Sequence, residues 1–183
     1  TTCVVSSHCN AIKLGTETNG GVRNINIHGM VVKPSADQSS QYFGKKRGIC
    51  GIALEIVDGG TLENVNVSDI TITGTESPIF VRLANRARGY YEGQVIDSIG
   101  KLRDVSLSNI RITDAGSYGC SITGLPGHPV ENITLDNILL SHEGGGKNCP
   151  VPTDEKEKEY PEATMWGPFP AKGFFVHHAR NIK

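Results

Sequence analysis

The chain has 183 residues, 37% of them hydrophobic, and its 18 Lys and Arg side chains nearly balance 19 Asp and Glu side chains. This size suits a single compact domain with its own core. Because the net charge is only -1 and the basic residues are scattered, we expect no nucleic-acid partner. No apolar run is long enough to cross a membrane as a helix, so we expect no membrane partner either.

Two kinds of segment alternate along the sequence. The first kind has the composition of a short strand: NAIKLGTE from Asn10, GIALEIVDGG from Gly51, PIFVRLANR from Pro78, GCSITGLPG from Gly119 and GFFVHHARN from Gly173. The second kind is a degenerate repeat: VRNINIHGMVV from Val22, LENVNVSDITI from Leu62, LRDVSLSNIRI from Leu102, VENITLDNILL from Val130 and the start of a fifth copy, ARNIK, from Ala179. Such self-similarity is typical of a stacked array of structural repeats.

An Asn or Asp shared by all copies sets the repeat spacing. It occurs at Asn24, Asn64, Asp104, Asn132 and Asn181, so successive copies lie 40, 40, 28 and 49 residues apart. The shortest interval is the bare unit, and the longer ones contain insertions near 33–49, 85–100 and 143–172. Insertions in repeat proteins collect on one face, so we expect these three to wall a groove.

Each copy contains two pairs of alternating apolar residues, such as Val65 and Val67 followed by Ile70 and Ile72. A period of two predicts strands, and the slip between the pairs predicts a bend between two short strands. The bend positions carry residue types that tolerate a left-handed backbone: Gly29, Asp69, Asn109 and Asn137. The aligned copies predict two inward columns, one of Ile27, Val67, Leu107 and Leu135 and the other of Val32, Ile72, Ile112 and Leu140.

These elements predict an all-β fold, a right-handed single-stranded parallel β-helix in which like residues stack coil upon coil. Residues 1–183 then form one partial domain of about four to five coils. A β-sandwich is the alternative, but it predicts no positional equivalence between copies. The chain begins without Met and stops inside a repeat, so we expect it to be a piece of a longer protein. Missing N-terminal coils or another chain should cover its ends.

The third insertion, residues 143–172, has two parts of different character. The charged run from Thr153 to Glu159 has the composition of a solvated loop. The stretch after it carries Tyr160, Met165, Trp166 and Phe169, which are too apolar to remain in water. We therefore expect these side chains to pack on the groove or to cap a sheet.

The outward positions of the first-kind segments carry an unusual set of polar side chains: Lys13, Glu17, Glu55, Asp58, Arg82, Asn85 and Arg86. Stacked coils bring such residues within about 4.8 Å of one another per strand. A ladder that only balances charge is one interpretation. As a group, carboxylates, guanidinium groups and amides along a groove also suit a polar polymer, above all a sugar chain. We expect these residues to line one groove.

The sequence offers no evident metal site and no cofactor motif. The five cysteines form no pair of CxxC motifs, and the histidines at 8, 128, 177 and 178 lie on different segments without a short ligand spacing. Buried free thiols and disulfides both remain possible, although the odd number leaves at least one cysteine unpaired.

Five stretches together resemble the C-terminal half of family 28 glycoside hydrolases, the polygalacturonase-like pectin hydrolases. They are SSHCNAIKLGTETNGG, GIALEIVDGGTLENV, PIFVRLANR, LPGHPVENITL and YPEATMWGPFPAKGFFV. The resemblance implies a right-handed parallel β-helix that hydrolyses galacturonan or rhamnogalacturonan with inversion, using carboxylates. It also implies a secreted or periplasmic protein whose partner is an acidic plant cell-wall polysaccharide or oligosaccharide.

The family motifs match this chain only in part. The Asn-Thr-Asp and Asp-Asp motifs that supply the family's catalytic acids are not in this sequence, and the resemblance places them upstream of Thr1. The Gly-His-Gly motif corresponds to HCNAIKLG, where His8 is offset and Asn10 stands at the His position. The Arg-Ile-Lys motif corresponds to LEIV, where Glu55 and Val57 replace the two cations.

The resemblance therefore implies a substrate-binding half whose binding residues are those of the outward set together with His8 and Asn10. Arg82 and Arg86 could form a carboxylate clamp in place of the lost cations. Glu55 and Asp58 are weaker candidates for a catalytic role. Two alternatives stay open: a non-catalytic β-helix that binds glycans, and a pectate-lyase-like enzyme, which needs a calcium site that the sequence does not show.

Overall fold

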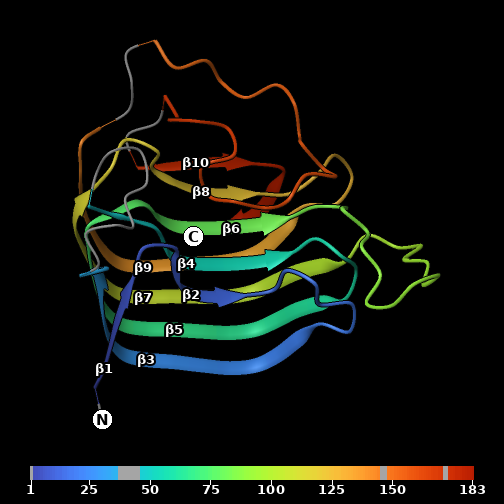
Figure 1. Cartoon of the computed structure of the whole chain (residues 1–183), viewed down its shortest axis with the longest axis horizontal. Coiled ribbons are helices and arrows are strands. Elements are labelled where there is room, and N and C mark those ends of the chain that lie inside the picture. Colours follow the sequence, from blue (N-terminus) through green and yellow to red (C-terminus); the bar gives the residue numbers. More distant parts are fainter. Residues whose placement is uncertain (1, 37–45, 145–147, 171–172) are drawn as a thin grey trace.

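The computed structural model describes residues 2–36, 46–144, 148–170 and 173–183, and its regular structure is entirely β (Figure 1). Within these ranges there is no helix of the length and apolarity that a membrane span requires. The chain passes back and forth between two sheets, so that odd-numbered strands enter one sheet and even-numbered strands the other.

The first sheet contains, in spatial order, β1 (Cys3–Ser7), β3 (Val22–Pro34), β5 (Thr61–Thr73), β7 (Lys101–Ala115), β9 (Val130–His142) and β11 (Ala179–Ile182). The second contains β2 (Asn10–Leu14), β4 (Gly48–Ile56), β6 (Thr75–Leu83), β8 (Cys120–Thr123) and β10 (Phe174–His177), again in chain order. Every neighbouring pair of these strands is parallel. This arrangement confirms the all-β, parallel class and is compatible with the expected β-helix.

Strand register confirms both predicted inward columns. Ile27 pairs with Val67, Val67 with Leu107, and Leu107 with Leu135. The second column runs in the same way through Val32, Ile72, Ile112 and Leu140. The members on β5 and β7 are buried, as is Val32 on β3, whereas Ile27, Leu135 and Leu140 are only partly covered.

The predicted bends are present, but each lies inside one continuous strand rather than between two short ones. Gly29, Asp69, Asn109 and Asn137 have φ of 66°, 56°, 53° and 51°. The shared Asn or Asp of each repeat is also left-handed, with φ between 54° at Asn64 and 59° at Asn24. Its side chain forms hydrogen bonds between neighbouring strands: Asn64 Nδ2 donates to Asn24 Oδ1 at 2.7 Å and Asn132 Nδ2 to Asp104 Oδ1 at 2.7 Å. This position of the repeat thus provides inter-strand side-chain hydrogen bonds as well as a turn.

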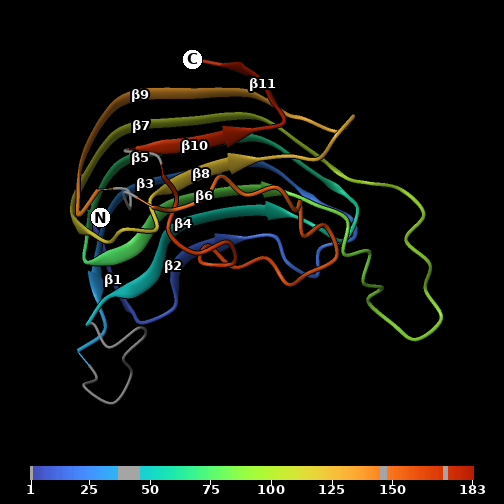
Figure 2. The same ribbon diagram turned by 90° about the horizontal axis from the view of Figure 1, so that it is seen from above.

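The main core lies between the two sheets, which face each other as layers (Figure 2). It draws Ile52, Leu54 and Val81 from the even-numbered strands and Val67 and Leu107 from the odd-numbered ones. All five cysteines are free, and Cys50 and Cys120 are buried. Burial raises the pKa of the Cys120 thiol to about 12, so this side chain packs as a small apolar group.

The three insertions form the connections between the sheets. Of the first, residues 37–45 lie outside the described part of the chain, as do 145–147 and 171–172 of the third. Residues 85–100 project as a strandless loop between β6 and β7 (Figure 2). Residues 148–170 pack on the outer face of the second sheet, where Met165 and Trp166 contact a buried cluster that includes Ala53 and Phe80. Phe169 is buried and stacks on Phe175 with ring centroids 4.6 Å apart.

Candidate functional site

The residues expected to bind substrate lie on the outer face of the second sheet and on the connections beside it. Lys13, Glu55 and Arg82 belong to β2, β4 and β6, and strand register places Glu55 directly beside Arg82. Glu17, Asp58, Asn85 and Arg86 follow the ends of these three strands, while His8 and Asn10 stand at the start of β2. Two buried carboxylates, Glu55 and Asp58, organise the rest.

Glu55 is 1% exposed and pairs with Lys13. Lys13 Nζ lies 3.3 Å from Glu55 Oε2, and Thr16 Oγ1 donates to the same oxygen at 2.5 Å. Within the described residues, Glu55 Oε1 is buried and has no hydrogen-bond partner. Burial raises the pKa of Glu55 to about 7, against the attraction of Lys13 and the Thr16 hydrogen bond. This carboxyl group can therefore take up or release a proton near neutral pH.

Asp58 is fully buried, but its pKa is shifted in the opposite direction from that of Glu55. Its carboxylate accepts hydrogen bonds from Arg86 Nε at 2.9 Å, from the backbone N–H of Arg88 at 2.9 Å and from that of Glu17 at 2.8 Å. Arg86 Nη2 also pairs with it. Burial disfavours the charged form, but these donors outweigh it and lower the pKa of Asp58. Two carboxyl groups three positions apart in sequence thus have pKa values shifted in opposite directions.

The same two carboxylates hold a strained turn after β2. Thr16 and Glu17 are non-glycine residues with φ of 42° and 64°, in the left-handed region that such residues avoid. Thr16 is held through its hydroxyl by Glu55, and Glu17 through its N–H by Asp58. A costly backbone conformation persists only where its surroundings fix it, and such turns concentrate at functional sites.

Arg82 lies on the expected face, yet it is not open to solvent. Its guanidinium is fully buried, with Nη1 3.3 Å from Thr123 Oγ1 and 3.4 Å from the Gly124 carbonyl oxygen, and Nη2 donates to the Glu155 carbonyl. The Trp166 ring covers it, with the Arg82 Cζ 4.8 Å from the ring centroid. Burial lowers the pKa of Arg82 to about 10, so it remains charged at neutral pH. The guanidinium binds the chain's own carbonyls in the position where a substrate clamp was expected.

The segment 148–170 supplies this cover, which differs from the expected open groove. Tyr160 lies over both Lys13 and Arg86, with their cationic atoms 5.0 and 5.5 Å from its ring centroid, and Lys13 Nζ donates to its hydroxyl at 3.3 Å. The backbone N–H of Asn85 donates to the Glu157 carbonyl at 2.9 Å. Lys13 stays partly accessible, and Tyr160, Glu17 and Arg88 are exposed at the edge of the cover.

His8 and Asn10 lie apart from the two carboxylates. The His8 carbonyl accepts a hydrogen bond from the Ile49 N–H at 3.3 Å, so its backbone joins the first turn to β4. Asn10 pairs with Cys50 in the register of β2 and β4. Within the described residues, its Oδ1 atom is buried without a hydrogen-bond partner.

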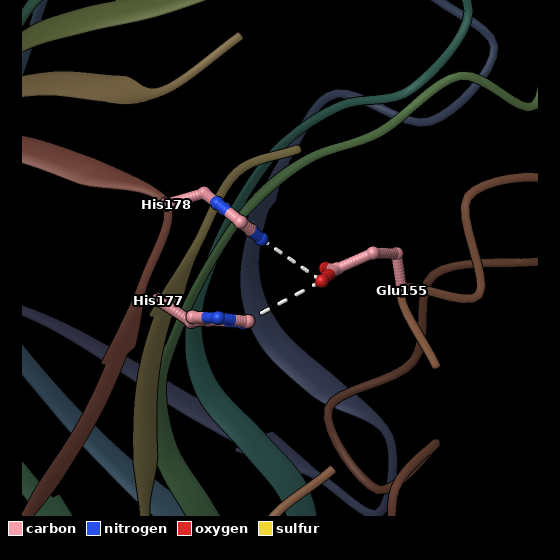
Figure 3. A group of neighbouring side chains, drawn as sticks. All are labelled: Glu155, His177 and His178. Carbon is pink, nitrogen blue, oxygen red and sulfur yellow. Dashed lines mark hydrogen bonds and ion pairs between the residues drawn. The ribbon is translucent and has the colours of Figure 1, made fainter. Parts of the chain in front are cut away.

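Sequence reasoning missed several members of the site. Thr16 and Arg88 lie in the connections after β2 and β6, where no strand periodicity marks them, and Arg88 pairs with Glu17. It also expected no metal ligands, because the histidines have no regular spacing. The structure nevertheless brings His177 and His178 together with Glu155, a residue from the non-repeating insertion (Figure 3).

The raised pKa of Glu55 predicts a pH-dependent stability. In the unfolded chain its pKa returns to about 4.5, so the folded state binds the proton more tightly, and the stability gained from protonation is lost as pH rises towards 7. Between about pH 4.5 and about pH 8 the free energy of unfolding of the wild type should fall by about 2–3 kcal/mol relative to that of Glu55→Gln. Urea unfolding at several pH values measures this difference. Glu92→Gln, in the exposed 85–100 loop, is the control and should follow the wild type.

No family model, curated protein or solved structure matches the chain. A functional assignment therefore rests on the residues described above.

Proposed function

We propose that the chain is a right-handed parallel β-helix forming the substrate-binding half of an inverting glycoside hydrolase that acts on acidic pectic polysaccharide. The strict alternation of strands between two parallel sheets and the in-register columns support the β-helix. The resemblance of five stretches to family 28 glycoside hydrolases supports the substrate class. In this proposal the catalytic aspartates, which carry out the hydrolysis, belong to coils outside this sequence.

One observation carries the binding proposal: two buried carboxylates hold a set of cations and a strained turn at one edge of the second sheet. Glu55 positions Lys13, while Asp58 positions Arg86 and the backbone of Arg88. Lys13 keeps partial solvent access beside the exposed ring of Tyr160, and the exposed Arg88 side chain pairs with Glu17. Lys13, fixed by Glu55, and Arg88, anchored through its backbone by Asp58, can receive the carboxylate of a uronic acid, and an aromatic ring offers a flat surface to a sugar face.

In this arrangement the residues have separate roles. Arg88 and Lys13 contact the sugar carboxylate, and an Arg can do so with two parallel hydrogen bonds. Glu55 and Asp58 act as positioning residues, because both are buried beneath the cations. Arg82 fixes the covering segment through the Glu155 carbonyl, which sets where Tyr160 lies.

Binding measurements with Arg88→Ala test the proposal. Loss of a charge-assisted contact should weaken the affinity for oligogalacturonides by roughly 10- to 100-fold and leave that for neutral galactan oligosaccharides unchanged. Arg111→Ala removes an exposed Arg from β7 of the other sheet and should bind like the wild type. Isothermal titration provides the measurement. Equal binding of acidic and neutral sugars by the wild type, or an equal effect of both substitutions, would contradict the proposal.

A second candidate is a glycan-binding β-helix without catalysis. It is favoured by one observation, the lack of the Asn-Thr-Asp and Asp-Asp motifs in this sequence. The two candidates predict the same binding profile but different products. Release of reducing ends from polygalacturonate, with inverted anomeric configuration, by a longer protein that includes the proposed upstream coils distinguishes the hydrolase from the binder.

A further inference from the structure

Glu155, His177 and His178 form a cluster outside the carboxylate site (Figure 3). His178 Nε2 lies 2.9 Å from Glu155 Oε1, and His177 Nδ1 lies 3.6 Å from the same oxygen. One ligand atom from each of the three side chains lies within 4.8 Å of the other two. We propose that these three residues bind a zinc ion, whose remaining coordination position is taken by water.

The backbone brings the two imidazoles to one side. Neighbouring residues of a regular strand point to opposite faces of the sheet. His177 ends β10 and His178 lies just before β11, and the left-handed φ of 47° at His178 interrupts the alternation. The two rings therefore lie together, with centroids 3.9 Å apart. A left-handed conformation is unfavourable for a non-glycine residue, so the backbone is strained where the two histidines meet.

The donor set and its dimensions suit zinc. Two imidazole nitrogens and one carboxylate oxygen match the protein ligands of open zinc sites, at distances of about 2.0–2.2 Å from the metal. Ligands at this distance in tetrahedral geometry lie about 3.4 Å from one another. The separations of 2.9 and 3.6 Å from the carboxylate oxygen fall on either side of that value, and the two histidine nitrogens lie within 4.8 Å of each other. Side-chain rotations that bring the two nitrogens to the tetrahedral spacing would admit the ion.

A simple ion pair explains less of the geometry. It accounts for the short contact between His178 and Glu155, but a surface pair of this kind is weak and needs only one imidazole. It gives no reason for His177 to face the same carboxylate oxygen. The three side chains are partly exposed, so an ion and its water can reach them.

A metal ion bound at this position would link two separate segments of the chain. Glu155 belongs to the segment 148–170 that covers the second sheet, and its carbonyl accepts the hydrogen bond from Arg82. His177 ends β10, and His178 connects it to β11 of the other sheet. A zinc ion would join the cover to that turn and so fix the cover above Arg82. This inference is independent of the proposed sugar substrate.

Cobalt titration of tag-free, chelator-treated protein tests the site. The wild type should bind one equivalent of Co²⁺ with the visible absorption bands of four-coordinate cobalt, and one equivalent of Zn²⁺ should abolish them. His178→Ala should weaken the affinity by more than about 100-fold, since losing even an outer-shell partner costs about 10- to 100-fold. His177→Ala and Glu155→Gln should behave similarly.

His128→Ala is the matched control, because it removes an exposed histidine from the turn before β9. It should bind cobalt like the wild type. Circular dichroism of the metal-free variants checks that each is folded, and Glu155→Gln preserves side-chain shape if a histidine variant fails this check. The site is refuted if the wild type shows no saturable binding, if His178→Ala binds as tightly as the wild type, or if a thiolate charge-transfer band reveals cysteine ligation.

Discussion

Replacing Asp58 by Ala is expected to lower the free energy of unfolding by about 3–5 kcal/mol, because it removes one partner of a buried ion pair. Asp58 is fully buried, and Arg86 is only 11% exposed. The substitution leaves the Arg86 guanidinium and the N–H groups of Glu17 and Arg88 without their common acceptor. It also removes the hydrogen bond that holds the left-handed turn at Glu17 in place.

Urea unfolding followed by circular dichroism measures this loss. Asp97→Ala, in the exposed 85–100 loop, is the matched control and should stay within about 0.5 kcal/mol of the wild type. The lowered pKa of Asp58 adds a second test. Its contribution should be present at neutral pH and disappear as the pH falls through its folded-state pKa, so wild type and Asp58→Ala should converge in acid. A loss of free energy below about 1 kcal/mol at neutral pH would mean that the Asp58 network stabilises the fold no more than an exposed ion pair does.

The opposite pKa shifts of Glu55 and Asp58 come from their donors rather than from burial alone. Both side chains are almost completely inaccessible. Asp58 receives hydrogen bonds from two backbone N–H groups and a guanidinium, whereas one oxygen of Glu55 has no hydrogen-bond partner among the described residues. Burial without enough donors favours the neutral acid, and burial with many donors favours the anion. The edge of the second sheet therefore combines one permanent negative charge with one exchangeable proton.

The strands and their parallel register were largely predictable because their determinants are local and repeated. Alternating apolar residues predicted the strands, and Gly29, Asp69 and Asn109 marked bends that the structure confirms as left-handed. Aligning the copies then predicted the inward columns, since a residue that recurs at one position of a repeat faces the same neighbour in each copy. The same alignment used Asn24 and Asn64 only as markers, although both are left-handed and bonded to each other.

The candidate site was less predictable because its main determinant is not repeated. Alternation placed Glu55 and Arg82 on one outer face, and the structure agrees. Their burial depends on the segment 148–170, which occurs once and contacts them from far along the chain, as in the hydrogen bond between Arg82 and Glu155, 73 positions apart. The convergence of His177 and His178 depends on a single backbone angle that the residue type does not indicate. Periodicity carries no information on either feature.

Leu107 provides the most direct test of the packing between the sheets. It is 0% exposed and lies in the inward column between Val67 and Leu135. Leu107→Ala should lower the free energy of unfolding by about 2–5 kcal/mol, since the removed methyl groups leave a cavity that rigid strands on both sides cannot close. Ser106→Ala changes the outward neighbour on the same strand and should have an effect within about 0.5 kcal/mol.

Leu135 separates the effect of the column from that of the residue type. It occupies the next position in the same column, but it is only partly buried. Because less of its side chain is removed from water and its surroundings can relax, Leu135→Ala should cost less than Leu107→Ala. Equilibrium urea unfolding of both variants gives the comparison. Equal losses at the two positions, or a loss below about 1 kcal/mol at Leu107, would mean that the middle strands do not carry the core, and the proposal of stacked coils would have to be abandoned.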